Sequence, residues 1–311
     1  MNDKEILLNI YNKKYLLPVY SGTLAIEGVL RALKLNNNDK VLITNVVCYS
    51  ILQAILNANL APVIAIPSNG LTLNKKEIKD IVESENIKVF IAVHQYGYEQ
   101  EIEKYKDLII IEDISQAWNI KLSDRYVGEN SDYIISSLGK NKPLSNDIGG
   151  LIISDIDFLS KFDTKSKKCR NSYDNILEFY YPLHINYKKI VRKADKKIVS
   201  QRNNAKFLKK IFVKYDFIKI FDEKNTVPSY HRFPIFIKDS EYNNFIKILD
   251  KCKVNYQKEY KRKLDKINVV KSKNIKVVGN GQNIKCLLLK TNNNYLTIKR
   301  LELEMRKQYG S

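Results

Sequence analysis

Short apolar runs alternate with helical patterns through the first half of the chain. The runs are rich in Ile and Val and lack polar alternation, which is typical of strands buried on both faces of a parallel sheet. Helical patterns at 50–58 and 75–84 separate the first three runs. This order predicts an α/β fold in which helices cover a mainly parallel sheet. The runs lie at residues 41–44, 62–66, 89–93, 108–111, 133–135 and 150–153.

The pattern changes after the last of these runs. A helix is predicted at 200–214, and the remainder predicts a strand, a helix, short strands and a last helix at 297–308. A length of 311 residues also suggests about two domains. We therefore expect a large domain over residues 1–195 and a smaller α+β domain over residues 196–311.

The composition favours a folded protein without a membrane anchor. Apolar residues make up 44 % of the chain, which is ample for a buried core. No stretch approaches the roughly 18 consecutive apolar residues of a membrane span, and the N-terminus lacks the basic start and apolar run of a secretory signal. The four cysteines, Cys48, Cys169, Cys252 and Cys286, show no metal-binding spacing. We expect a cytoplasmic protein with reduced thiols.

The formal net charge of +19 is concentrated in one stretch. Residues 161–215 contain 16 Lys or Arg against 4 Asp or Glu. A basic surface attracts nucleic acid, anionic lipid or a diphosphate-bearing small molecule, although a solvated lysine-rich face is the simpler interpretation. Because no nucleic-acid-binding signature accompanies the charge, we do not expect a nucleic-acid partner.

A Ser-Gly-Thr segment precedes an apolar helical pattern near the N-terminus. Ser21 is a candidate N-cap, and Gly22 lets the backbone approach a ligand closely. The helix that begins here would present free N–H groups and a positive dipole end, which suit a phosphate. Taken alone, the segment is most simply a helix cap.

Two acids follow the apolar run at residues 108–111. Open α/β sheets bind their ligands at the carboxyl ends of strands, so Asp113 could pair there with a protonated ring nitrogen. Gln116, one turn later, could donate a hydrogen bond to a ring oxygen. Capping of the following turn by the acid is the simpler alternative.

A glycine-flanked loop between two predicted strands carries Lys142. A lysine in such a loop can be desolvated, which lowers its pKa and frees the amine as a nucleophile. The hydroxyl of Ser137, at the start of the loop, could bind phosphate. Any single lysine among so many is most simply a surface residue, so only its combination with the other segments points to chemistry.

Five short motifs follow one another in a specific order. The order Ser-Gly-Thr, His-x-Tyr-Gly, Glu-Asp-x-x-Gln-Ala, Ser-x-x-x-x-Lys-x-Leu and Gly-Gly resembles the DegT/DnrJ/EryC1/StrS family. These are enzymes dependent on pyridoxal 5′-phosphate (PLP), mostly aminotransferases of nucleotide-linked keto sugars. The match runs over residues 5–155 and resumes at 201–205 and 229–235. It implies the aspartate-aminotransferase fold, with a mainly parallel sheet of the seven-stranded type and a smaller C-terminal α+β domain.

The resemblance also implies roles for individual residues. Lys142 matches the lysine that holds PLP as a Schiff base, and Asp113 matches the carboxylate that pairs with the pyridinium nitrogen. Gln116 matches the residue near the phenolic oxygen of the cofactor. The matches to phosphate contacts are Gly22, Thr23 and Ser137.

Other positions of the motifs leave alternatives open. Tyr49 is our candidate for the aromatic residue that stacks on the cofactor ring, although Cys48 aligns comparably well. His94 and Tyr96 belong to the His-x-Tyr-Gly motif, where a structural role is at least as well supported as a catalytic one.

The resemblance implies a complete reaction. PLP acts as the electron sink, and the freed Lys142 amine moves a proton as general base and general acid. Glutamate is the expected amino donor and a keto sugar the expected acceptor, in a ping-pong cycle. A homodimer is expected from the family, and two-fold dimers are the commonest oligomers in general.

The match weakens in three places, so other functions stay open. The chain is shorter than typical relatives at both ends, and Ile148 replaces a family glutamate. The segment that normally sends an asparagine to the partner's phosphate is not recognisable, with Asn175 and Asn186 as possible substitutes. A PLP enzyme that dehydrates a deoxy sugar or aminates a small ketone, and a non-catalytic relative, are the alternatives.

Overall fold

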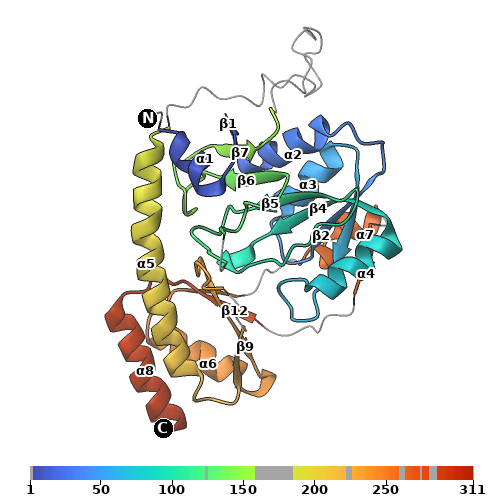
Figure 1. Cartoon of the computed structure of the whole chain (residues 1–311). Helices are drawn as coiled ribbons and strands as arrows, with labels where there is room; N and C mark the ends of the chain where they lie inside the picture. The colour runs from blue at the N-terminus through green and yellow to red at the C-terminus, as the bar shows by residue number, and fades with distance from the viewer. Residues whose placement is uncertain are drawn as a thin grey trace.

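Two β-sheets, each covered by helices, make up the described part of the protein, for which we obtained a computed structural model (Figure 1). Cys169 and Asn175, named above, lie outside the described residues, as does much of the basic stretch. No helix within the described part of the chain is long and apolar enough to cross a membrane. The structure describes residues 3–122, 125–157, 185–221, 226–258, 263–273, 275–279 and 286–310.

The larger sheet has eight strands in the order β1-β7-β6-β5-β4-β2-β3-β11. Neighbouring strands are parallel from β6 to β11, whereas β7 runs antiparallel to both of its neighbours, β6 and the edge strand β1. The predicted α/β fold with a mainly parallel sheet is confirmed, with one strand more than the seven-stranded type. The strands are β1 (Tyr15–Val19), β2 (Lys40–Thr44), β3 (Ala61–Ala65), β4 (Ile87–Val93), β5 (Ile109–Asp113), β6 (Tyr133–Ser137), β7 (Gly150–Ser154) and β11 (Lys276–Val278).

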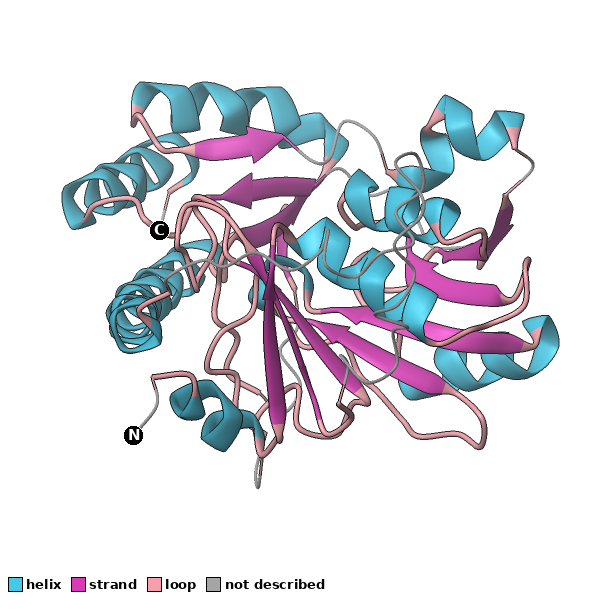
Figure 2. Ribbon diagram, turned by 90° about the horizontal axis from the view of Figure 1, so that it is seen from above, coloured by secondary structure: helices cyan, strands magenta, loops and turns pink. Residues whose placement is uncertain are grey.

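Helices cover both faces of this sheet (Figure 2). Strand side chains alternate between the faces: Val41 and Ile43 pack with α2 and α3, whereas Leu42 packs with Ile78 of α4. Burial on both faces explains why the strands carry uninterrupted apolar runs. The elements on the two faces include α1 (Glu5–Tyr11), α2 (Gly22–Ala32), α3 (Tyr49–Asn57), α4 (Lys75–Glu85), η4 (Leu264–Lys266) and α7 (Asn268–Ser272); η1 (Gln95–Gly97) follows β4.

The smaller sheet is antiparallel, in the order β10-β12-β9-β8. Phe233 of this sheet packs with aromatic and aliphatic side chains of three helices, including Phe212, Phe245 and Leu301. These contacts form a core of their own, as expected for the C-terminal α+β part. Its elements are β8 (Ile218–Ile220), β9 (Phe233–Ile237), β10 (Tyr256–Lys258), β12 (Cys286–Leu289), α6 (Asp239–Lys251), α8 (Tyr295–Tyr309) and the second half of α5 (Tyr187–Phe212).

Two features depart from the expected division at residues 195 and 196. Helix α5 runs through that point without a break and packs Ile190 with the large core and Leu208 with the small one (Figure 1). Strand β11, far along the chain, returns to pair with β3 of the large sheet. Both were missed because the first half of α5 is dominated by lysines and β11 is a three-residue edge strand.

Candidate functional site

Three neighbouring strands of the large sheet end at one cavity, which we call the strand-end pocket. Val93, Asp113 and Ser137 are the last residues of β4, β5 and β6, and the first turn of α2 completes the wall. The space between the walls is about 620 Å³. Its lining residues are Ser21, Gly22, Thr23, Ile26, Cys48, Ser50, Ile51, Val93, Gln95, Asp113, Ser115, Gln116, Ser137 and Lys142.

The N-terminus of α2 supplies backbone donors to the pocket. The side chain of Ser21 caps the helix by accepting a hydrogen bond from the backbone N–H of Leu24 at 3.2 Å. That leaves the first N–H groups of the helix, those of Gly22 and Thr23, for an anion. A Cβ atom on Gly22 would lie 2.9 Å from the Cβ of Ser137, so only glycine lets the helix and β6 come this close.

A chain of hydrogen bonds joins the ends of β5 and β6. The backbone N–H of Ser115 donates to Asp113 Oδ1 at 2.8 Å, and the hydroxyl of Ser115 accepts from the backbone N–H of Ser137 at 2.8 Å. Asp113 is buried, with 6 % of its surface exposed. The carboxylate is therefore held in a fixed position at the floor of the pocket. Sequence reasoning gave no role to Ser115, although it lies within the acidic motif.

Two glutamines beside Asp113 orient each other. The backbone N–H of Tyr96 donates to Gln116 Oε1 at 3.2 Å, which fixes the orientation of that amide. The Gln116 Nε2 then donates to Gln95 Oε1 at 3.1 Å. Gln95 was not predicted as a site residue, because the middle position of the His-x-Tyr-Gly motif carries no signal of its own.

Lys142 lies in a tight loop that a second lysine secures. Its backbone N–H donates to the carbonyl of Gly139, closing a turn. From α5, the Lys197 ammonium donates to the carbonyl of Asn141 at 3.1 Å and approaches that of Lys142 at 3.5 Å. Burial, with a smaller effect of Arg232, lowers the pKa of Lys197. Sequence reasoning gave no role to Lys197, although it lies within the basic stretch at residues 161–215.

All the predicted site residues except Tyr49 line the strand-end pocket. Tyr49 is 44 % exposed and lines a different cavity together with residues of η4 and α7. Cys48, the alternative left open by the sequence, lines the strand-end pocket instead. Asn186, a candidate for the contact with a partner's phosphate, caps α5 by accepting from the backbone N–H of Lys189 at 2.8 Å.

His94 forms a buried pair that does not line the pocket. Its Nδ1 accepts from the backbone N–H of Gln100 at 3.0 Å, so Nε2 carries the proton and donates to Glu112 Oε2 at 2.8 Å. The backbone N–H of Gly128 donates to the same oxygen. These contacts fasten the turn after β4 to the end of β5 and support a structural role for His94. Tyr96 lines a second cavity.

This second cavity, which we call the basic cavity, adjoins the strand-end pocket. The two share Gln116 and Lys142, so the lysine stands at their boundary. Two residues come from the turn before β9, which the backbone N–H of Arg232 ties to the carbonyl of Tyr96. The space between its walls is about 530 Å³. The described residues that line it are Tyr96, Gln116, Lys140, Asn141, Lys142, His231, Arg232 and Gln257.

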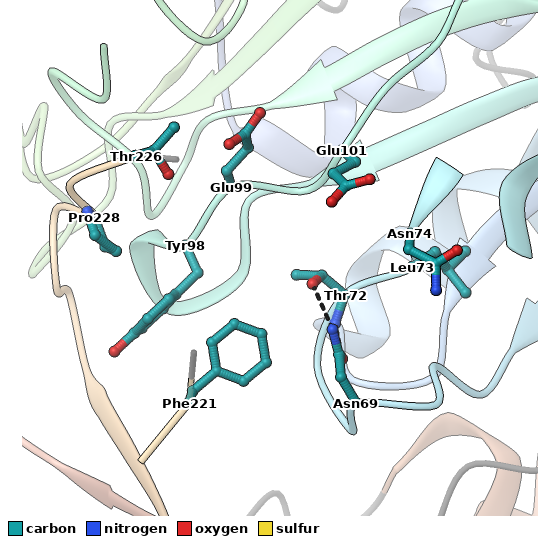
Figure 3. Close-up of a pocket in the computed structure, with 10 residues that line it drawn as sticks. All are labelled: Asn69, Thr72, Leu73, Asn74, Tyr98, Glu99, Glu101, Phe221, Thr226 and Pro228. Atoms are coloured by element: carbon teal, nitrogen blue, oxygen red, sulfur yellow. Dashed lines mark hydrogen bonds between the residues drawn. The ribbon is translucent and has the colours of Figure 1, made fainter. Parts of the chain in front are cut away.

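Another cavity, the acidic pocket, shares no lining residue with the strand-end pocket or the basic cavity (Figure 3). Glu99 and Glu101 lie on the segment that follows η1, and Tyr98 points toward Phe221. Burial raises the pKa of Glu99. None of the predicted site residues belongs to this pocket, which is lined by Asn69, Thr72, Leu73, Asn74, Tyr98, Glu99, Glu101, Phe221, Thr226 and Pro228.

The groups of the strand-end pocket complement PLP. The N–H groups of Gly22 and Thr23 and the hydroxyl of Ser137 suit a phosphate. Asp113 offers a carboxylate for a protonated ring nitrogen. Within the described part of the chain, the Lys142 ammonium makes no hydrogen bond or ion pair that would hold it away from an aldehyde. One cavity thus combines an anion cradle, an acid and an amine.

Solved structures of enzymes share this architecture. GDP-4-keto-6-deoxy-D-mannose-3-dehydratase of E. coli, solved with bound hydrated PLP, has a TM-score of 0.79 and 16 % identity, covering 96 % of this chain and 89 % of that one. Helicobacter pylori PseC, an aminotransferase involved in the biosynthesis of pseudoaminic acid, has a TM-score of 0.79 and 16 % identity, covering 99 % and 90 %. The similarity establishes the fold of these enzymes for the present chain.

The sequence places the chain within one family of that fold. The model of the DegT/DnrJ/EryC1/StrS aminotransferase family matches residues 5–169, just over half of the chain. The chain belongs to this family. GDP-perosamine synthase of Escherichia coli O157:H7 is 27 % identical over 149 residues, which are 45 % of this chain and 40 % of that protein. The alignment thus spans less than half of the curated relative.

Proposed function

We propose that the protein is a PLP-dependent aminotransferase that moves an amino group from a donor such as glutamate to a keto group of a nucleotide-linked sugar. The observation that carries this proposal is the convergence of Lys142, Asp113 and the N-terminus of α2 on one pocket. Family membership and the names of the relatives support it.

Each wall of the strand-end pocket has its own task in this proposal. The N–H groups of Gly22 and Thr23 and the hydroxyl of Ser137 hold the phosphate. Asp113, kept in place through Ser115, pairs with the ring nitrogen and keeps it protonated. Gln116, oriented by Tyr96 and Gln95, lies beside the ring. Bound PLP supplies an electron sink.

Lys142 performs the proton transfers. Its amine takes a proton from the substrate carbon as general base and returns one as general acid. The hydrogen bonds from Lys197 to the backbone of the loop keep this amine at the boundary of the two cavities. The substrate thus approaches from the basic cavity while the cofactor occupies the strand-end pocket.

The acceptor and the assembly are part of the proposal. Among the relatives are GDP-perosamine synthase and an aminotransferase of pseudoaminic acid biosynthesis, which favours a nucleotide-linked sugar over a small ketone. We further propose that the protein works as a cytoplasmic homodimer, as expected from the family.

An absorbance spectrum with added PLP tests the cofactor and the amine together. Wild type should show a visible band from PLP joined to Lys142, and glutamate should remove it. Lys142→Ala should lack the band, whereas Lys140→Ala, two residues away in the same loop, should keep it. Identical spectra of wild type and Lys142→Ala would overturn the proposal.

A further inference from the structure

The basic cavity is lined by cations and hydrogen-bond donors. Lys140, Lys142 and Arg232 contribute positive charge, and no Asp or Glu is among the described residues that line it. Lys197 adds charge nearby, because its ammonium donates to the carbonyl of Asn141, which lines the cavity. Several cations that line one cavity, with no carboxylate beside them, produce a positive potential there. This potential attracts anions.

His231 lines this wall and contains a buried donor without a described partner. The side chain is buried, with 7 % of the residue exposed, and its Nδ1 has no hydrogen-bond partner among the described residues. A guanidinium only donates, so the Arg232 nitrogen that lies 3.4 Å from His231 Nε2 faces the lone pair of the ring. The proton of the neutral imidazole is therefore on Nδ1, a buried atom without a partner among the described residues.

The ring stays neutral for a physical reason. Burial, followed by the charges of Arg232, Lys197 and Lys142, holds the pKa of His231 well below its usual range. A buried donor that lacks a partner costs free energy. An oxyanion in the cavity would compensate the positive charges around it, and a rotation of the His231 ring would bring the N–H to this acceptor.

We propose that the basic cavity binds an oxyanion group of a substrate, either a carboxylate or a phosphate, through Arg232, Lys140 and the Nδ1–H of His231. This site is separate from the phosphate cradle of the strand-end pocket, because the two cavities share only Gln116 and Lys142. The identification of the anion as a substrate rests on the proposed function. Its position beside Lys142 brings the rest of that substrate to the reacting amine.

Calorimetric titration with simple anions tests the site. The probes are glutarate, a dicarboxylate without an amine, and inorganic phosphate, each added to PLP-loaded protein so that the cofactor fills the other cradle. Glutarate is also added to protein without PLP, so that anion binding is measured even if PLP does not bind. The variants are Arg232→Gln, His231→Phe and Lys140→Met, and the exposed Lys76→Met, on α4, controls for the lost surface charge.

At least one probe should bind wild type, and Arg232→Gln should weaken it about tenfold or more, as expected for a hydrogen bond to a charged group. Lys140→Met should weaken it less, and Lys76→Met should leave it unchanged. Preference for glutarate assigns the site to the carboxylate of the amino donor, and preference for phosphate assigns it to the acceptor. Because Lys140 is exposed, its variant should fold even if His231→Phe does not. The proposal is overturned if neither probe binds wild type, or if the cavity variants bind like Lys76→Met.

Discussion

The strand-end pocket and the basic cavity meet at Lys142 but are built in different ways. The first lies at the carboxyl ends of neighbouring strands and α2, and hydrogen bonds within the protein, such as those of Ser115, already fix Asp113 and Ser137. The second takes His231 and Arg232 from the turn before β9 and contains a buried donor without a described partner. The strand-end pocket is therefore preorganised, whereas our proposal is that the basic cavity is completed only by its ligand.

This difference separates the consequences of mutation. Changes in the strand-end pocket should impair cofactor chemistry and the packing of α2 against the sheet. Changes in the basic cavity should alter substrate affinity and the response to pH.

Asp113→Asn should abolish most turnover and leave PLP bound. The neutral amide cannot keep a ring nitrogen cationic, and loss of a preorganised electrostatic contact typically costs roughly 10²- to 10³-fold in rate. Steady-state kinetics and the PLP absorbance measure the two properties separately. The matched control is Asp147→Asn, which changes an exposed residue in the loop that carries Lys142 and should behave like wild type. Full activity of Asp113→Asn would refute the role of this carboxylate.

Gly150→Ala should destabilise the protein by about 1–3 kcal/mol, the usual cost of overpacking. A Cβ atom there would lie 2.5 Å from the backbone carbonyl of Ser21 and 2.7 Å from the nitrogen of Gly22, so the start of α2 would have to move. Urea unfolding measures the effect. Gly139→Ala is the control, since its Cβ would meet only the Ser137 hydroxyl, at 3.4 Å. Equal unfolding midpoints for the two variants would show that the close approach of α2 has no energetic weight.

His231 should make stability fall as the pH drops below 6.5, the usual pKa of histidine. Its pKa is lowered in the folded protein, so the unfolded chain binds a proton that the folded chain does not. The stability is fully present above the unfolded pKa and is lost below it, by at most about 1.4 kcal/mol per pH unit. The difference in unfolding free energy between wild type and His231→Gln, measured across this range, isolates the contribution. A difference that does not change with pH would contradict a neutral buried imidazole.

The sequence was sufficient for the parts of the molecule that repeat simple physical patterns. Strands β2 to β7 were predicted because burial on both faces requires uninterrupted apolar runs. The family resemblance selected Asp113, Gln116 and Lys142, and all three line one pocket. Each of these motifs is a short continuous segment beside a strand end or a helix start. The spacing of its residues in the sequence therefore also sets their spacing in the structure.

The contacts between distant segments could not be predicted in this way. Lys197 and His231 come close to Lys142 only through tertiary packing: Lys197 donates to the backbone of the loop that carries Lys142, and His231 lines the basic cavity together with that lysine. The choice between Tyr49 and Cys48 could not be made from the sequence for the same reason. Tyr49 begins α3, one residue after Cys48, and its side chain lines another cavity.

Borohydride reduction of the PLP-loaded protein, followed by peptide mapping with mass spectrometry, tests the central claim most directly. The treatment makes the bond between PLP and a lysine permanent, so the modified peptide identifies the amine without reference to turnover. We predict that the PLP mass is found on Lys142 and that Lys142→Ala takes up none. Modification of Lys140 or Lys197 in its place, or equal labelling of Lys142→Ala, would contradict the assignment of the strand-end pocket.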